Sequence, residues 1–279
     1  PVSWAPEMCI RDRYGETLSS YAYATLNTAN LYYLIGANWT DLAAHVPTAL
    51  PLVTALAAMS GGLWLLLSGE KLSLRSRPRS TSLGALCLLL ALYQFGLTFF
   101  GGSYSAYGYG MTAFAFLLAA VCLACDRKAA ALPFYLALSL ILIYVLGVKV
   151  HERYLLPALP LLLLAYVLTR DRRLLALCVG FSITTFINTA IVLDNAILFG
   201  AEMGHLNDDT LVLNDALCAL NLLLCGYAVW LAYTGLRPSE APIPHEAEPA
   251  VPPSYERMLL SPRDARLRLT LRDYLVMGA

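Results

Sequence analysis

Charged side chains are scarce in this chain, making up 14% of its 279 residues, whereas hydrophobic residues make up 58%. Soluble domains carry roughly 25% charged residues. A chain so poor in charge cannot cover a water-facing surface, so the composition excludes an ordinary soluble domain and indicates that the surface faces lipid. The formal net charge of +0 gives no sign of a nucleic-acid partner, and we expect none.

The chain also lacks a nucleotide-binding glycine loop and an internal repeat. Six of its seven cysteines fall inside apolar runs. Cys122 and Cys125 form a C-x-x-C without a partner pair, which we interpret as packing and not as zinc or redox chemistry. A loose metal-ligand spacing occurs at Glu202, His205, Asp208 and Asp209. We interpret this loop as a solvated acidic turn, and we assign no metal site and no cofactor.

Both ends of the chain have unusual sequences. Residues 8–13 read Met-Cys-Ile-Arg-Asp-Arg, and one set of codons for them resembles a transposon end used to build sequencing libraries. We therefore interpret residues 1–13 as translated adapter and expect a C-terminal fragment whose native part begins near Tyr14. Residues 269–279 run from a polar flank into an apolar stretch, which predicts the start of a further, truncated helix or, alternatively, a short amphipathic terminal helix.

Seven apolar runs approach the roughly 20 residues needed to cross about 30 Å of hydrocarbon. They lie at 47–69, 82–101, 110–126, 131–149, 155–169, 174–194 and 212–235. We predict an all-α, polytopic membrane protein with about seven transmembrane helices in a domain over 47–235. An interfacial segment over 14–46 would precede it, and a proline-rich linker over 236–268 would follow it.

The loops between these runs alternate in charge. Ten basic residues lie on one side: Lys71, Arg75, Arg77, Arg79, Arg127, Lys128, Arg170, Arg172, Arg173 and Arg237. The other side has the uncharged loop 101–110, the acidic loop 194–209, and two basic residues, Lys149 and Arg153. The positive-inside rule makes the first side cytoplasmic. We therefore predict a multi-pass protein of the cell membrane, with Gly15–His45 outside and the chain from Leu236 onward in the cytoplasm.

A charged cluster stands between two spans on the predicted outer side, where Lys149, His151, Glu152 and Arg153 follow one another closely. Cationic donors at a membrane surface suit an anionic ligand such as a lipid phosphate, and Glu152 could orient His151 or Arg153. The alternative is ordinary interfacial charge, in which Lys149 extends its amine to the headgroups and Arg153 pairs with Glu152.

Amide and aromatic side chains are dense between Ala22 and Trp39. If this segment is helical, Asn27, Asn30 and Leu34 share one face. Amides bond sugar hydroxyls and aromatic rings cover apolar sugar faces, so the segment suits a sugar. The alternative is an interfacial belt, where Trp and Tyr are common.

The stretch His151-Glu-Arg-Tyr-Leu-x-Pro157, at the outer start of a late helix, resembles bacterial polytopic glycosyltransferases of the GT-C type. More narrowly, it resembles relatives of the mannosyltransferases of GPI-anchor synthesis and of protein O-mannosyltransferases. Its His-Glu pair is similar to His-Glu-Lys in the glucosyltransferases of N-glycan assembly. The stretch Thr25–Trp39 also resembles a segment of this group, although Ala29 stands where the family usually has an aromatic residue. The resemblance covers roughly residues 20–195.

This resemblance implies transfer of a mannose-like hexose from a polyprenyl-phosphate donor to an acceptor glycan, lipid or protein on the outer face. It implies two groups of site residues: donor-phosphate contacts at Lys149, His151 and Arg153, supported by Glu152, and sugar-path or lipid-path contacts at Asn27, Asn30 and Trp39. The family's catalytic acid lies in the first outer loop. We expect that loop upstream of Tyr14, so we assign no catalytic residue here and expect the fragment to be inactive by itself.

Two other classes of function fit the same pattern. A lipid-linked sugar flippase or transporter would also need outer cations for a phosphate, but it should show polar or charged residues at mid-membrane depth. The mid-span positions look almost wholly apolar, which favours an enzyme. A non-catalytic membrane subunit predicts that His151 and Arg153 point apart toward water.

Overall fold

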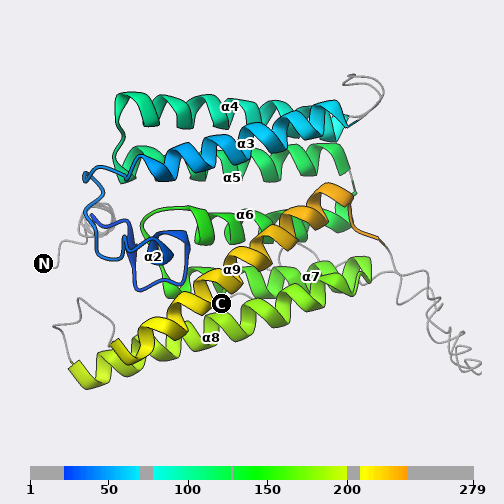
Figure 1. Cartoon of the computed structure of the whole chain (residues 1–279). Coiled ribbons are helices and arrows are strands. Elements are labelled where there is room, and N and C mark those ends of the chain that lie inside the picture. The colour runs from blue at the N-terminus through cyan, green and yellow to red at the C-terminus, as the bar shows by residue number, and fades with distance from the viewer. Residues whose placement is uncertain (1–21, 69–77, 127, 200–207, 238–279) are drawn as a thin grey trace, which may run out of the picture. The chain divides into compact units, whose positions relative to one another are not determined.

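The computed structural model describes residues 22–68, 78–126, 128–199 and 208–237 (Figure 1). Within these ranges, seven helical segments are long and apolar enough to cross a membrane. They comprise α3 (Ala49–Leu67), α4 (Pro78–Phe100), α5 (Tyr104–Asp126), η1 (Ala129–Ala131) with α6 (Leu132–Leu146), η2 (Glu152–Leu155) with α7 (Ala158–Thr169), α8 (Arg173–Phe199) and α9 (Asp208–Thr234). The predicted all-α, polytopic membrane fold is confirmed. Which end faces the cytoplasm stays a prediction.

Consecutive long helices run in alternating directions and pack on their neighbours (Figure 1). Helix α6 contacts α5, α7 and α9, and it is the most enclosed of the candidate spans. Its side chains Phe134, Leu138 and Ile141 are completely buried. Helix α3 lies at the margin and leaves large side chains such as Trp64 exposed. The exposed leucines and aromatics of the outer helices therefore form the surface that faces lipid.

Helices α3 and α4 approach each other closely at two glycines. A Cβ atom on Gly84 would lie 2.7 Å from Leu66, and one on Gly62 would lie 3.0 Å from the carbonyl oxygen of Gly84. Side chains at either position would therefore push the two helices apart. Small residues at such contacts are a common basis of helix association in lipid, where apolar packing provides much of the attraction.

The loop predicted over 101–110 is much shorter in the structure. Helix α5 begins at Tyr104, which leaves Gly101–Ser103 as the connection from α4. Tyr104 and Tyr107 are buried, and the ring centroid of each lies within 6.4 Å of that of Tyr32. This tertiary contact extends the helix beyond its apolar run.

Several predictions fall outside the described residues. These are the adapter at residues 1–13, the linker and terminal helix beyond 237, and the loop residues Glu202 and His205. The basic residues Lys71, Arg75, Arg77 and Arg127 also lie there. Of the basic residues that are described, Lys128, Arg170, Arg172 and Arg237 lie in connections at one end of the helices, and Arg79 and Arg173 lie in the first turns of α4 and α8, as the charge alternation predicts.

Candidate functional site

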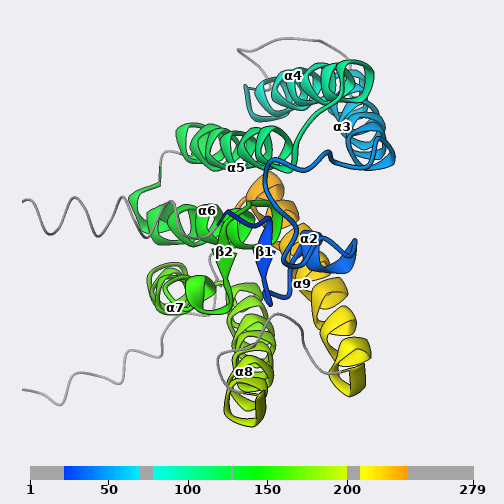
Figure 2. The same ribbon diagram turned by 90° about the vertical axis from the view of Figure 1, so that its left-hand side faces the viewer.

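Two short strands bring the two sequence motifs together at the other end of the helices (Figure 2). Strand β1 (Thr25–Leu26) pairs in parallel with β2 (Val150–His151), so that Leu26 lies opposite His151. The N–H of Lys149 donates to the carbonyl oxygen of Ala24 at 3.1 Å. The pairing places the segment from Ala22 to Trp39 directly beside the charged cluster.

Side-chain contacts fix this pairing from both sides. The hydroxyl of Thr28 donates to the carbonyl oxygen of Val150 at 2.8 Å and is completely buried. Val148 packs on Gly108 of α5, where a Cβ atom would collide with the valine. The charged cluster is therefore anchored between α5 and β1.

The side chains of Asn27 and Trp39 are hydrogen-bonded to each other. The Oδ1 atom of Asn27 accepts from the indole N–H of Trp39 at 3.1 Å and from Nδ2 of Asn38 at 2.7 Å. Trp39 is half-buried and makes an edge contact with Tyr23, at a centroid distance of 5.2 Å. Asn27 itself is buried, so Trp39 is the better placed of the two to touch a sugar, and that contact stays a prediction.

Asn30 caps a one-turn helix. Its Oδ1 atom accepts from the N–H groups of Tyr32 and Tyr33, both at 3.1 Å, at the start of α2 (Leu31–Leu34). Asn27 lies outside this helix, in a left-handed backbone conformation, so the shared helical face with Asn30 does not form. The Asn30 side chain is completely buried, and its role in the described structure is to cap α2.

A buried amide on α8, which sequence reasoning missed, holds the segment from Ala22 to Trp39 in place. Asn188 Oδ1 accepts from the N–H of Ala29 and from the hydroxyl of Tyr144, both at 3.2 Å. Its Nδ2 donates to the carbonyl oxygen of Asn27 at 3.0 Å and to Oδ1 of Asn214 at 3.2 Å. One side chain thus joins the segment to α6, α8 and α9.

A second amide does the same from α9, where Asn221 donates to the carbonyl oxygen of Ala29 at 2.8 Å. The inference that the mid-span positions are almost wholly apolar is therefore wrong for the last two spans. Completely buried polar side chains there include Thr184, Asn188 and Asn221. The signal was present in the sequence, since an amide inside an apolar run needs a partner in lipid.

The charged cluster itself is partly exposed. Lys149 and His151 are half-buried, whereas Arg153 is exposed. Burial lowers the pKa of the His151 imidazole below its usual range, the charge of Arg153 lowers it further, and Glu152 opposes both. The His151 ring lies edge-on to Tyr154, at a centroid distance of 5.3 Å. The described residues form no Arg153–Glu152 ion pair, so the Arg153 guanidinium is not held by that carboxylate.

Backbone strain gathers at this site. Four non-glycine residues of the described part have positive φ, and three of them are predicted site residues: Asn27 at 51°, Trp39 at 57° and Lys149 at 58°. A left-handed conformation costs such residues roughly 1–2 kcal/mol. Strain of this kind persists where the surroundings enforce it, and it is frequent at functional sites.

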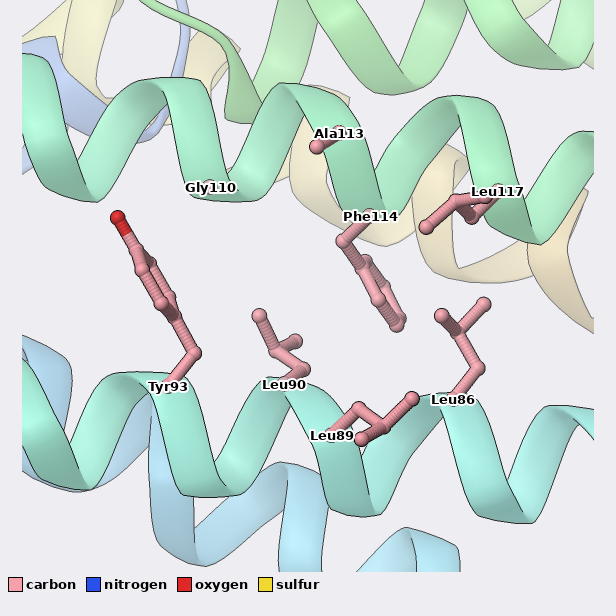
Figure 3. A pocket seen from close by; sticks show the side chains of 8 residues that line it. All are labelled: Leu86, Leu89, Leu90, Tyr93, Gly110, Ala113, Phe114 and Leu117. Carbon is pink, nitrogen blue, oxygen red and sulfur yellow. The ribbon is translucent and has the colours of Figure 1, made fainter.

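An apolar cleft of about 270 Å³ lies apart from the cluster, between α4 and α5 (Figure 3). Its walls are mainly leucines with Phe114, and the Tyr93 ring occupies the space that the missing side chain of Gly110 leaves. The Tyr93 hydroxyl donates to the carbonyl oxygen of Ala106 at 2.7 Å. No charged side chain lines this cleft, so it fits a hydrocarbon chain.

Within the described ranges, no three His, Cys, Asp or Glu side chains gather as metal ligands. Cys122 is buried in the core beside α6. Comparisons of this chain with protein-family models, with curated proteins and with solved structures found no match.

Proposed function

We propose that this chain belongs to a membrane glycosyltransferase that uses a polyprenyl-phosphate-linked hexose, with the donor phosphate held at the β1–β2 end. The observation that carries the proposal is the pairing of Leu26 with His151. It places the amide-rich and aromatic segment beside Lys149, His151 and Arg153, as a sugar attached to a phosphate requires. The left-handed backbone at Lys149 and Trp39 adds support.

The three side chains have different tasks in this proposal. Arg153 and Lys149 supply fixed positive charge to the phosphate, which is the leaving group when the acceptor oxygen bonds to the anomeric carbon. His151, whose half-buried position lowers the pKa of its imidazole, donates one hydrogen bond to the phosphate oxygen on which negative charge grows. Glu152 and Tyr154 keep the imidazole oriented. No catalytic acid is assigned in this chain.

A lipid-linked sugar flippase is the second candidate, and the buried amides of α8 and α9 favour it to a degree. A transport path needs polar groups that face a passage. Asn188 and Asn221 instead bond the main chain of the docked segment. Both amides are therefore used in holding this segment, which favours a site at the membrane surface.

The experiment measures binding of a short-chain polyprenyl-phosphate mannose to the purified chain in a neutral detergent, with the matching polyprenol as the phosphate-free probe. R153Q should weaken binding of the phosphate probe roughly 10- to 100-fold, the effect of one charge-assisted contact. R172Q, an equally exposed arginine at the other end, is the matched control. Equal binding of the two probes, or equal loss in both variants, would sink the donor-site proposal.

Enzyme and flippase are separated in membranes that carry the protein, given labelled donor and acceptor. An enzyme moves the label from the lipid to the acceptor, and R153Q lowers the rate. A flippase moves the intact lipid between leaflets and transfers nothing.

A further inference from the structure

At the end of the bundle that carries the basic connections, hydrogen bonds to Asp171 join the start of α8 to the residues that follow α9. Its carboxylate accepts from the backbone N–H, Nε and Nη2 of Arg173, with distances of 2.6–3.2 Å, and from the N–H of Arg237 at 2.8 Å. Arg173 Nη2 also donates to the carbonyl oxygen of Gly235 at 3.0 Å. The carboxylate is therefore saturated with donors, and its charge is neutralised by one arginine.

The second acidic side chain at this end is neutralised in the same way. Asp126 accepts from the Tyr135 hydroxyl at 2.8 Å, and its Oδ2 lies 4.0 Å from Nη2 of Arg79. Arg79 also donates to the carbonyl oxygen of Tyr233 at 3.1 Å. Neither acid is left to attract or repel a further ligand.

Basic side chains remain after these pairings. Lys128, Arg170 and Arg237 are exposed, and the described residues give none of them an ion-pair partner. Arg170 ends α7 in a left-handed conformation with φ of 58°, which turns the chain sharply toward α8. Among the described residues, these three form a positive rim without a balancing acid.

Lys128 of this rim lines a small, mainly apolar cleft of about 110 Å³. Its lining comes from η1, the end of α7 and the residue after α9: Lys128, Ala130, Ala131, Leu168, Thr169 and Leu236. The Thr169 hydroxyl donates within its own helix, to Ala165, so it is not a free donor. Arg170 and Arg237 directly follow two of the lining residues in the chain.

We propose that this cleft binds an anionic phospholipid, with the phosphate at Lys128 and Arg170 and the upper part of an acyl chain in the cleft. Basic pockets between transmembrane helices are a known arrangement for acidic headgroups. Below the cleft, Leu164 lies one turn from Leu168 on the same face of α7, and both are about half exposed. The acyl chain continues along this face. A free phosphate would use the rim and leave the apolar wall empty, whereas a zwitterionic lipid would leave the rim unbalanced.

The test measures lipid retention by native mass spectrometry of the purified chain, with dioleoyl phosphatidylglycerol, dioleoyl phosphatidylcholine or inorganic phosphate as the probe. The proposal expects preferential retention of phosphatidylglycerol. K128Q combined with R170Q should weaken retention of phosphatidylglycerol roughly 30-fold, because each variant removes one basic contact and each contact strengthens binding about five-fold. R172Q, an exposed arginine of the same turn that is not adjacent in the chain to any lining residue, should change it little.

A second pair of variants tests the apolar wall and avoids any change of charge. L168W should fill the cleft and lower retention, whereas L163W, on the same helix and equally exposed, should not. Three results would each overturn the proposal. They are equal retention of the two lipids, equal effects of L168W and L163W, and retention of inorganic phosphate as strong as that of phosphatidylglycerol. The outcome is independent of the glycosyltransferase proposal, which concerns the other end of the helices.

Discussion

Asn188 holds Asn27 by its main chain, since its Nδ2 donates to the carbonyl oxygen of Asn27 at 3.0 Å. The same amide bonds Ala29, Tyr144 and Asn214, so that both hydrogens of Nδ2 and both lone pairs of Oδ1 are used inside the protein. The position of the segment from Ala22 to Trp39 therefore depends on a side chain of α8.

We expect N188A to destabilise the folded protein by about 2–3 kcal/mol, because it leaves the N–H of Ala29 and the carbonyl of Asn27 buried without partners. The measurement is the free energy of unfolding in mixed detergent. S182A is the control, since the Ser182 hydroxyl bonds within its own helix, to Cys178. An N188A effect no larger than that of S182A would show that the segment is held by other contacts.

Thr28 and Thr25 offer a matched pair on opposite sides of Leu26. Both are completely buried, but the Thr28 hydroxyl bonds Val150, whereas the Thr25 hydroxyl has no partner in the described structure. T28V should cost about 1 kcal/mol, and T25V should be neutral or slightly stabilising. Thermal unfolding of the two variants decides this, and a larger loss from T25V would contradict the assigned pairing.

His151 should give stability a pH dependence. Because burial lowers its pKa in the folded state, the neutral ring is favoured there, and the contribution is present above about pH 6.5. It is lost as pH falls through the lower folded-state pKa. H151Q should flatten the fall in the thermal midpoint between about pH 7 and pH 5. An H151Q variant whose thermal midpoint falls as steeply as that of the unchanged chain would contradict this assignment.

The contribution of Asp171 to the stability of the fold should depend on pH. Burial raises the pKa of its carboxyl, but the hydrogen bonds from Arg173 and Arg237 outweigh burial and hold the pKa below its usual range. Its contribution is therefore present above about pH 4 and is lost as pH falls through the lowered pKa. At neutral pH, D171N should cost about 3 kcal/mol, because Arg173 loses its counter-charge.

The double variant D171L/R173L should recover part of that loss, since an apolar pair leaves no charge unmatched. Chemical unfolding of the two variants measures the difference. A double variant less stable than D171N would mean that Arg173 also stabilises the fold through Gly235 and Trp230.

The helical spans could be predicted because length and apolar composition are local properties, and lipid permits few other structures. The start of α5 could not, because Tyr104 and Tyr107 join the helix through burial against Tyr32, which is distant in sequence. The β1–β2 pairing is too short for any strand pattern to appear in the sequence.

The candidate site was only half visible in the sequence. The charged cluster was apparent from Lys149 and Arg153, which break the charge alternation. The roles of Asn27 and Asn30 could not be predicted, because asparagine is a common residue type both for capping a turn and for binding a sugar. Asn188 and Asn221 were overlooked, since their partners are main-chain groups of a segment far away in the chain.

Ala29 is joined to Asn188 and Asn221, which follow it by 159 and 192 residues. A ribosome that adds about 5–20 residues per second needs roughly 8–40 seconds to synthesise that length. Throughout that time the N–H and carbonyl of Ala29 have only water or lipid headgroups to bond. The segment from Ala22 to Trp39 therefore takes its place among the last events of biogenesis, after α9 has emerged, and a nascent chain arrested before Asn188 should still expose this segment to protease.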